Sequence, residues 1–247
     1  SQGLIAGINA ALEVLGREQI VIDRSQGYIG VLIDDLVTKE NHEPYRMMTS
    51  RSEYRLLLRQ DNADQRLTPL GYKVGLISEQ RYQHLLTKMN LIEKEKQRLE
   101  ETMVGGSKEV QTFLERHEST TLKTAASLAE ILRRPEMKYE YLKEIDPERP
   151  ELSWDVCEQV EIDIKYDGYI KRQLKQVEQF KKLEEKRIPD DIDYDQINSL
   201  RIEAVQKLKL CKPISIGQAS RISGVSPADI SVLLVYLEQK RMHNHGE

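Results

Sequence analysis

The chain has 247 residues, of which 39% are hydrophobic and 32% are charged. Its 37 Lys and Arg residues stand against 41 Asp and Glu residues, which gives a formal net charge of −4 at pH 7. This composition excludes wholesale disorder. No apolar run reaches the roughly 20 residues that cross a bilayer, and no secretory signal is visible, so we expect a cytoplasmic protein without a membrane partner.

The motifs of a self-sufficient enzyme are missing from the sequence. There is no Gly-rich phosphate loop, no nucleophile elbow and no convincing Cys/His dyad. Cys157 and Cys211 are far apart, without a CxxC pair, and the H-N-H tripeptide of His243 and His245 would bind a metal only adventitiously. We therefore expect no catalytic residue, no cofactor site and no metal site within this chain.

The first segment is apolar on almost every side from Gly3 to Leu12, which predicts a helix that is packed all round. It begins without a capping residue or an initiator Met. We therefore expect that the chain was cut out of a longer protein, and that residues 1–18 form the closing helix of a preceding domain.

Arginines gather in the next part of the chain. Four arginines and one acid, Glu53, lie between Tyr45 and Gln60, a local charge of +3: Arg46, Arg51, Arg55 and Arg59. The last three are spaced at i, i+4 and i+8, which places them on one helical face, although they also share one face of a strand. We expect a helix that begins after Ser50.

Aligned guanidinium groups suit phosphate because they remain charged and fork onto its oxygens. Tyr45 and Tyr54 could stack on unpaired bases beside them. This pattern predicts a nucleic-acid contact. The alternative is that the arginines are neutralised within the chain by nearby acids, namely Asp34, Asp35, Asp61 and Asp64.

Helical periodicity continues through most of the remaining sequence, so we predict an all-α fold. Helices are expected over residues 78–103, over 107–117, after a capping box at Ser127 and Glu130, and over 154–186. Pro147 and Pro150 mark a linker. We expect a helical domain over residues 19–150, followed over 151–247 by the long helix and a three-helix subdomain.

The long predicted helix contains a second candidate site at residues 166–173. Gly168 costs a helix roughly 1 kcal/mol relative to Ala, which indicates a close approach by another group. A second helix packed over Gly168 and a ligand both remain possible, and Lys171 and Arg172 lie directly beside it.

The last 50 residues predict a helix-turn-helix with Gly224 in the turn. Its second helix starts at Ser226 and Pro227, which are typical of an N-cap and a first helical position. This helix is almost without basic residues, so we do not expect DNA as a partner. Its apolar stripe suits either a protein partner or a plain core: Ile230, Leu233, Leu234 and Leu237.

Several long strings closely resemble the C-terminal half of the glucose-inhibited division protein A family, also called MnmG or GidA. These strings are SQGYIGVLIDDLV at residues 25–37, EPYRMMTSRSEYRLLLRQDNADQRL at 43–67, YDGYIKRQ at 166–173 and IGQASRISGVSPADISVLLVYL at 216–237.

The resemblance implies a flavin-dependent enzyme that modifies tRNA. Members of the family bind FAD and NADH, act with a partner GTPase, and add a carboxymethylaminomethyl or aminomethyl group to carbon 5 of the wobble uridine, with methylenetetrahydrofolate as one-carbon donor. A homodimer is implied for the full-length protein. This chain lacks the family's dinucleotide fingerprint and redox cysteines, so we expect the fragment to hold no cofactor and to be inactive alone. Residues 1–18 then look like the end of the FAD domain.

The resemblance also implies that this helical region contacts both tRNA and the GTPase. The residues expected at tRNA are Arg46, Arg51, Arg55, Arg59, Lys171 and Arg172. The residues expected at the GTPase are Arg221, Ile230, Leu233, Leu234 and Leu237. The alternative is a scaffold that docks the GTPase without gripping tRNA.

Overall fold

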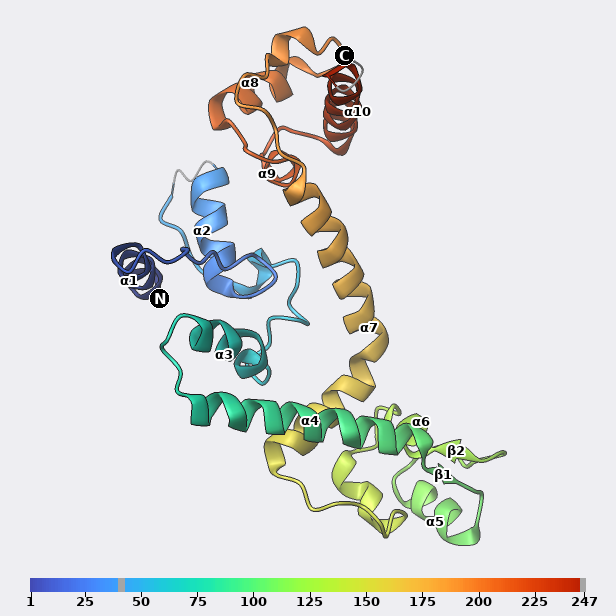
Figure 1. The fold of residues 1–247 in the computed structure, drawn as a ribbon. Coiled ribbons are helices and arrows are strands. Elements are labelled where there is room, and N and C mark those ends of the chain that lie inside the picture. Colours follow the sequence, from blue (N-terminus) through green and yellow to red (C-terminus); the bar gives the residue numbers. More distant parts are fainter. Residues whose placement is uncertain (40–42, 245–247) are drawn as a thin grey trace. The chain divides into compact units, whose positions relative to one another are not determined.

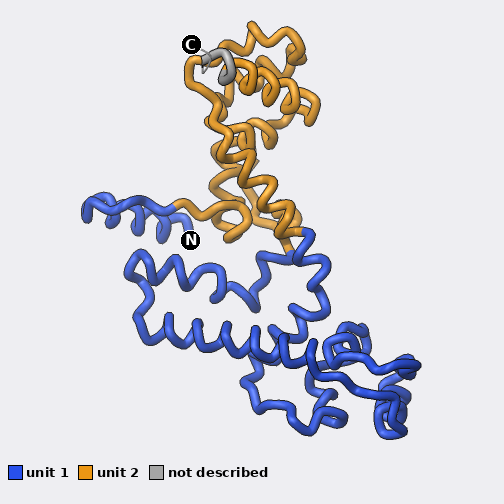
Figure 2. Tube along the Cα trace, turned by 45° about the vertical axis from the view of Figure 1, so that its right-hand side comes forward, with its two compact units in different colours: residues 1–20, 56–172 blue, residues 21–55, 173–247 orange. Residues whose placement is uncertain are grey.

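The computed structural model describes residues 1–39 and 43–244, with side chains described up to residue 240. Within that part the chain is almost entirely helical, as predicted (Figure 1). It forms two compact units: unit 1 contains residues 1–20 and 56–172, and unit 2 contains residues 21–55 and 173–247 (Figure 2). The side chains of His243 and His245 lie outside the described residues.

Unit 1 is built around the 23-residue helix α4 (Glu79–Glu101), which packs beside α3 (Ala63–Lys73) and against α6 (Leu128–Leu132). Its core lies between α4, α5 (Lys108–Arg116), α6 and the first part of α7 (Trp154–Glu185). Its most deeply buried side chains include Leu99, Leu114, Leu128, Tyr139 and Val160.

Local signals set the helix boundaries of unit 1 as predicted. The Ser78 hydroxyl accepts a hydrogen bond from the backbone of Arg81 at the start of α4. Ser127 and Glu130 form the predicted capping box of α6. An unpredicted element is a two-stranded antiparallel ladder of β1 (Met103–Val104) and β2 (Ala126–Ser127), with a 3₁₀ helix, η2 (Tyr139–Glu144), further along.

Helix α1 (Gln2–Val14) also belongs to unit 1, and here the structure differs from the prediction of all-round packing. Leu12 is its one fully buried residue, while Leu4 and Val14 are strongly exposed. The connection after α1 is held by Asn9, whose amide group exchanges two hydrogen bonds of 2.9 Å with the backbone of Ile20.

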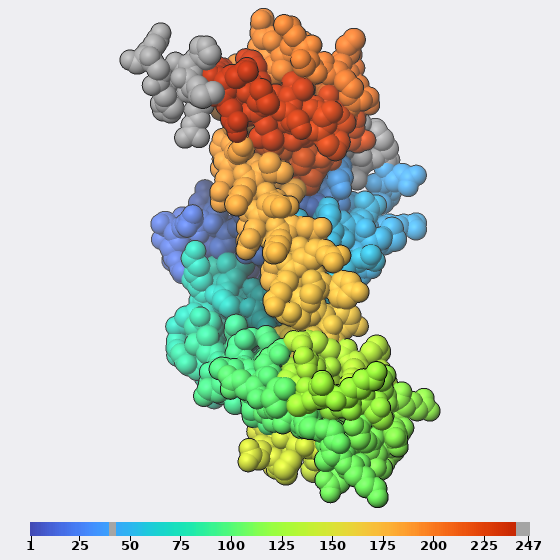
Figure 3. Space-filling view, turned by 90° about the vertical axis from the view of Figure 1, so that its right-hand side faces the viewer, coloured from blue at the N-terminus to red at the C-terminus, as the bar shows by residue number. Residues whose placement is uncertain are grey.

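Unit 2 contains α2 (Tyr28–Thr38), the end of α7 and the terminal bundle, which consists of η3 (Tyr194–Gln196), α8 (Ile202–Cys211), α9 (Ile216–Arg221) and α10 (Pro227–Asn244). Helix α10 packs against α9 and forms much of one face of this bundle (red in Figure 3). Gly224 adopts a φ of +95° in the turn between them, a conformation that glycine adopts readily. The predicted helix-turn-helix is therefore confirmed.

The predicted helix after Ser50 is wrong. A 3₁₀ helix, η1 (Thr49–Arg51), ends at Arg51, and residues 52–62 form turns and bends. The Ser52 hydroxyl accepts a hydrogen bond from the backbone N–H of Tyr54, and Arg24 donates to the carbonyl oxygen of Arg51. These bonds occupy backbone groups that a helix needs, so Arg51, Arg55 and Arg59 do not share a helical face.

Candidate nucleic-acid interface

Residues 45–55 of unit 2, here called the arginine segment, carry three of the four predicted arginines. Arg46 and Arg55 are exposed, and within the described residues neither forms an ion pair. Arg51 is half-buried, and its guanidinium lies 4.3 Å from the centre of the Tyr45 ring. The segment therefore presents positive charge to solvent without internal neutralisation of Arg46 or Arg55.

The two tyrosines of the segment are held by contacts within the chain. One face of the Tyr45 ring is covered by Arg51, and its hydroxyl donates a 2.8 Å hydrogen bond to Oδ2 of Asp35. Partial burial and this bond raise the pKa of Tyr45 to about 12. Tyr54 is 6% exposed, and burial raises its pKa too. The Tyr45 ring instead supports the Arg51 guanidinium through a cation–π contact.

Arg24, which is not among the predicted site residues, binds the arginine segment through Arg51 and Glu53. Its side chain is 4% exposed and donates to Asp35 at 2.7 Å, to Asp34 at 2.9 Å and to Oε1 of Glu53 at 2.8 Å. Burial opposes its charge, but the hydrogen bonds to Glu53 and Asp35 raise the pKa of Arg24 above its ordinary value. The guanidinium thus stays charged between three carboxylates.

Helix α2 supplies two of the three acids that bind Arg24, and this Asp pair lies among apolar residues. Asp35 is fully buried, and although burial opposes its charge, hydrogen bonds from Lys39, Tyr45 and Arg24 lower its pKa. An Asp pair inside an apolar helix needs a buried cation. That requirement predicts a buried cation beside α2, but the sequence alone does not show that Arg24 supplies it.

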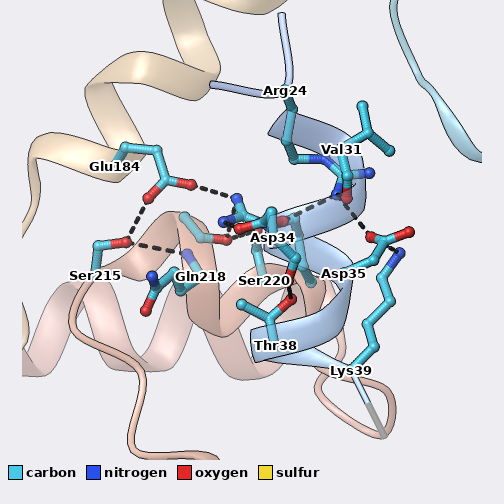
Figure 4. A network of polar contacts seen from close by, with 12 residues as sticks. Arg24, Val31, Asp34, Asp35, Thr38, Lys39, Glu184, Ser215, Gln218 and Ser220 are labelled. Carbon is cyan, nitrogen blue, oxygen red and sulfur yellow. Dashed lines mark hydrogen bonds and ion pairs between the residues drawn. The ribbon is translucent and has the colours of Figure 1, made fainter. Parts of the chain in front are cut away.

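The same network continues into the terminal bundle (Figure 4). Asp34 accepts a 2.7 Å hydrogen bond from Arg221, and Arg221 also pairs with Glu184 of α7. Glu184 in turn accepts a 2.6 Å hydrogen bond from the hydroxyl of Ser215, the N-cap of α9. A continuous polar chain thus joins α2, α7 and α9 within unit 2.

Arg59 lies in unit 1 and has partners within the chain. Its guanidinium pairs with Asp61 at 3.0 Å and donates to the carbonyl oxygen of Leu56 at 2.6 Å. Arg59 is therefore neutralised within the chain, as the alternative to a nucleic-acid contact predicted.

The second candidate site, residues 166–173, lies on α7, and the prediction of a second helix packed over Gly168 is wrong. A side chain added at Gly168 would meet no described atom within 4 Å, so no helix packs over this glycine. Lys171 pairs with Asp167 at 2.8 Å, whereas Arg172 is exposed and has no ion pair within the described part of the chain. Tyr169 is also well exposed.

The residues predicted to contact a protein partner are mostly buried in the terminal bundle. Ile230 and Leu233 belong to its core, and Leu234 and Leu237 pack against that core. The Arg221 side chain is 9% exposed. In this structure the stripe therefore has a packing role.

The described residues do not form the kind of site that binds FAD or NADH. Dinucleotide sites use a Gly-rich turn between a strand of a parallel sheet and a helix. The sheet of the described residues is a two-residue antiparallel ladder. Those residues also contain no cluster of three or more metal-ligating side chains, and none of their helices is both long and apolar enough to cross a membrane.

Comparison with known proteins relates both units to one family. Residues 79–174 match the family described as "tRNA modifying enzyme MnmG/GidA C-terminal helical domain". Residues 176–247 match the one described as "tRNA modifying enzyme MnmG/GidA C-terminal helical bundle".

Individual relatives agree with this assignment. The "tRNA uridine 5-carboxymethylaminomethyl modification enzyme MnmG" of Lachnoclostridium phytofermentans is 67% identical over 98% of this chain, and that of Geobacillus thermodenitrificans is 58% identical over 98%. The chain spans 38% of the length of each. Aquifex aeolicus GidA, in its form II crystal, superimposes with a TM-score of 0.78 at 45% identity, over 96% of this chain and 37% of that one. The chain belongs to the MnmG/GidA family of tRNA-modifying enzymes and carries the family's C-terminal helical domain and helical bundle.

Proposed function

We propose that this chain is the tRNA-binding and partner-binding region of an enzyme that installs a carboxymethylaminomethyl group on carbon 5 of the tRNA wobble uridine. The names of its relatives support the reaction. The chemistry that depends on FAD and NADH would be carried out by other parts of the cytoplasmic, homodimeric enzyme. This chain would bind and orient the RNA and dock the GTPase.

The observation that carries the proposal is the exposure of Arg46 and Arg55 without an acidic partner in the described residues. Acids outnumber bases in this chain, and other arginines, such as Arg59 and Arg98, are paired with carboxylates. An unpaired guanidinium does not have to break an internal ion pair before it binds a phosphate. Arg46 and Arg55 also lie in one segment with a local excess of positive charge, so they can bind an RNA backbone together.

Arg51 supports the same role in a different way. Its contact with the Tyr45 ring restricts the motion of the guanidinium, and its buried Nε has no hydrogen-bond partner within the described residues. A guanidinium held in one orientation loses less entropy when it forks onto a phosphate. Arg51 thus adds a pre-oriented donor between Arg46 and Arg55.

Arg172 supports a second RNA contact on α7. Gly168 lies four residues before it on the same helical face and leaves the helix surface open. A phosphate can approach the backbone closely at a glycine. Lys171 would have to exchange Asp167 for the RNA, so we assign it the weaker contact.

The partner-binding role is supported by apolar side chains that the terminal bundle leaves exposed. Ile202 is 78% exposed and Leu210 68%. Ile214 and Val235 are also exposed. We propose that the GTPase contacts these side chains, because Ile230 and Leu233 already pack the core. The exposure of these apolar side chains also favours the alternative function, a scaffold that docks the GTPase without binding tRNA.

The proposal is tested by titrating this chain with an unmodified tRNA that carries a wobble uridine. The variants are Arg46→Glu and Arg55→Glu, with Arg81→Glu as a control, since Arg81 is exposed on α4 and forms no ion pair within the described residues. We expect the first two to weaken binding and the control to bind like the parent chain. Binding of the GTPase with no retention of tRNA by the parent chain would support the scaffold instead.

A further inference from the structure

Asp34 bridges two arginines that come from distant parts of the sequence. Its Oδ2 accepts a hydrogen bond from Arg24 at 2.9 Å, and its Oδ1 accepts one from Arg221 at 2.7 Å. The side chains of Arg24, Arg221 and Asp34 are 4%, 9% and 16% exposed. Ion pairs shielded from water in this way are strongly coupled, unlike pairs on an open surface.

The Arg24 side of the bridge holds the arginine segment. Its Nη2 donates to the carbonyl oxygen of Arg51 at 3.3 Å, and its Nε and Nη2 both reach the Glu53 carboxylate. Arg24 therefore fixes the backbone at Arg51 and the side chain at Glu53. These positions lie between Arg46 and Arg55, so the course of the segment depends on Arg24.

The Arg221 side of the bridge holds the terminal bundle. Arg221 is the last residue of α9, and it pairs with Glu184 and donates to the carbonyl oxygen of Gly217 at 3.0 Å. Its guanidinium also lies 4.9 Å from the centre of the Phe180 ring. Displacement of α9 would therefore remove Arg221 from Asp34.

We infer that Asp34 and Arg221 are positioning residues for the arginine segment, so that its affinity for RNA depends on the placement of α9. This inference rests on the proposed function. Without Arg221, the carboxylate of Asp34 keeps Arg24 as its buried cation, and Arg24 is already shared with Asp35 and Glu53. The electrostatic attraction between Arg24 and Asp34 then changes, and the arginine segment, which Arg24 binds at Arg51 and Glu53, shifts with it.

The coupling is reciprocal by thermodynamic necessity. A protein that binds the terminal bundle and moves α9 changes RNA affinity at the arginine segment without touching RNA. RNA bound at the segment changes the affinity for that protein by the same factor.

The experiment measures tRNA affinity in Asp34→Asn, Arg221→Met and the double variant. We expect each single change to weaken binding on the order of threefold to tenfold, and the double variant to bind no more weakly than Asp34→Asn alone. Backbone amides of residues 45–55 should also exchange hydrogen faster in Arg221→Met, because the segment is less firmly held.

Two further variants separate positioning from loss of structure. Glu184→Gln removes the other acidic partner of Arg221 but leaves the bridge at Asp34, so its RNA affinity should match that of the parent chain. Arg221→Lys keeps a cation beside Asp34 and should restore most of the affinity lost in Arg221→Met.

Parental RNA affinity in Arg221→Met, in an assay where Arg46→Glu and Arg55→Glu weaken binding, overturns the inference and leaves the proposed function standing. Equal losses in Glu184→Gln and Asp34→Asn also overturn it, since general destabilisation of the bundle would then explain both. If Arg46→Glu and Arg55→Glu bind normally, the proposed function itself fails.

Discussion

Asp34 accepts a 2.7 Å hydrogen bond from Arg221, a residue 187 positions further along the chain. Through Arg24, the same carboxylate is connected to the backbone of the arginine segment. The exposed arginines therefore do not lie on an independent loop. They are supported by a buried network that also binds Arg221 at the end of α9.

The tight entry into α2 predicts that Gly30→Ala is severely destabilising. A Cβ at this position would lie 2.3 Å from the backbone oxygens of both Ile22 and Asp23, and backbone atoms cannot move aside cheaply. We expect the free energy of unfolding to fall by about 3 kcal/mol or more, as for overpacked cores. Urea denaturation measures this loss, and an unchanged midpoint would show that the 22–30 turn does not support α2.

Gly168→Ala should have the opposite effect on stability. The new methyl group meets open space on α7, and Ala is favoured over Gly inside a helix by roughly 1 kcal/mol. If this open surface receives the RNA backbone, tRNA affinity should nevertheless fall. A variant that is more stable and binds tRNA as tightly as the parent chain would remove Gly168 from the interface.

Tyr45 has two separable roles that two substitutions distinguish. Tyr45→Phe keeps the ring under Arg51 but removes the hydrogen bond to the buried Asp35, so we expect a loss of about 1–2 kcal/mol in unfolding free energy with RNA affinity retained. Tyr45→Leu removes the ring as well and should weaken RNA binding. Equal RNA affinity in both variants would argue against support of Arg51 by the Tyr45 ring.

Acid should destabilise the terminal bundle through Asp229. The hydrogen bond from Arg201 lowers the pKa of Asp229 far below its ordinary value of about 3.9, against the effect of burial and with help from Ser226. A carboxyl whose pKa is lower in the folded state stabilises that state above the unfolded pKa, and this contribution is lost as the pH falls through the folded pKa.

We therefore expect unfolding free energy to decline below about pH 4 and to decline less steeply in Asp229→Asn. That variant should also be less stable at pH 7. Asp191→Asn is the matched control, because Asp191 is 80% exposed and lies 3.7 Å from Lys240. Identical pH profiles in the two variants would contradict this assignment.

The sequence was most informative where structure depends on neighbouring residues. The caps at Ser78, Ser127 and Ser226 act within a single helical turn, so their helix starts were predicted correctly. Helix α3, which contains Pro69, is not among the predicted helices. The spacing of the arginines predicts a helix at residues 52–62, but these residues form turns because Arg24, 27 positions before Arg51, binds the carbonyl oxygen of Arg51.

The candidate site was predictable only in part, for the same reason. Composition and spacing identified the arginines as a group. Whether each one is paired depends on side chains that the fold brings together, such as Asp61 beside Arg59. The spacing of Gly168 indicated a close approach, but the open surface there required coordinates. Arg24 carries no local signal, since its partners lie 10, 11 and 29 positions away.

The central claim is that Arg46 and Arg55 hold RNA phosphates, and the salt dependence of tRNA binding tests it most directly. Each phosphate contact contributes about 0.7–0.9 to the slope of log K against log salt concentration. We predict that Arg46→Glu combined with Arg55→Glu lowers both the affinity and the slope, the latter by about 1.5, while Arg81→Glu changes neither. A double variant with the slope and affinity of the parent chain would contradict it.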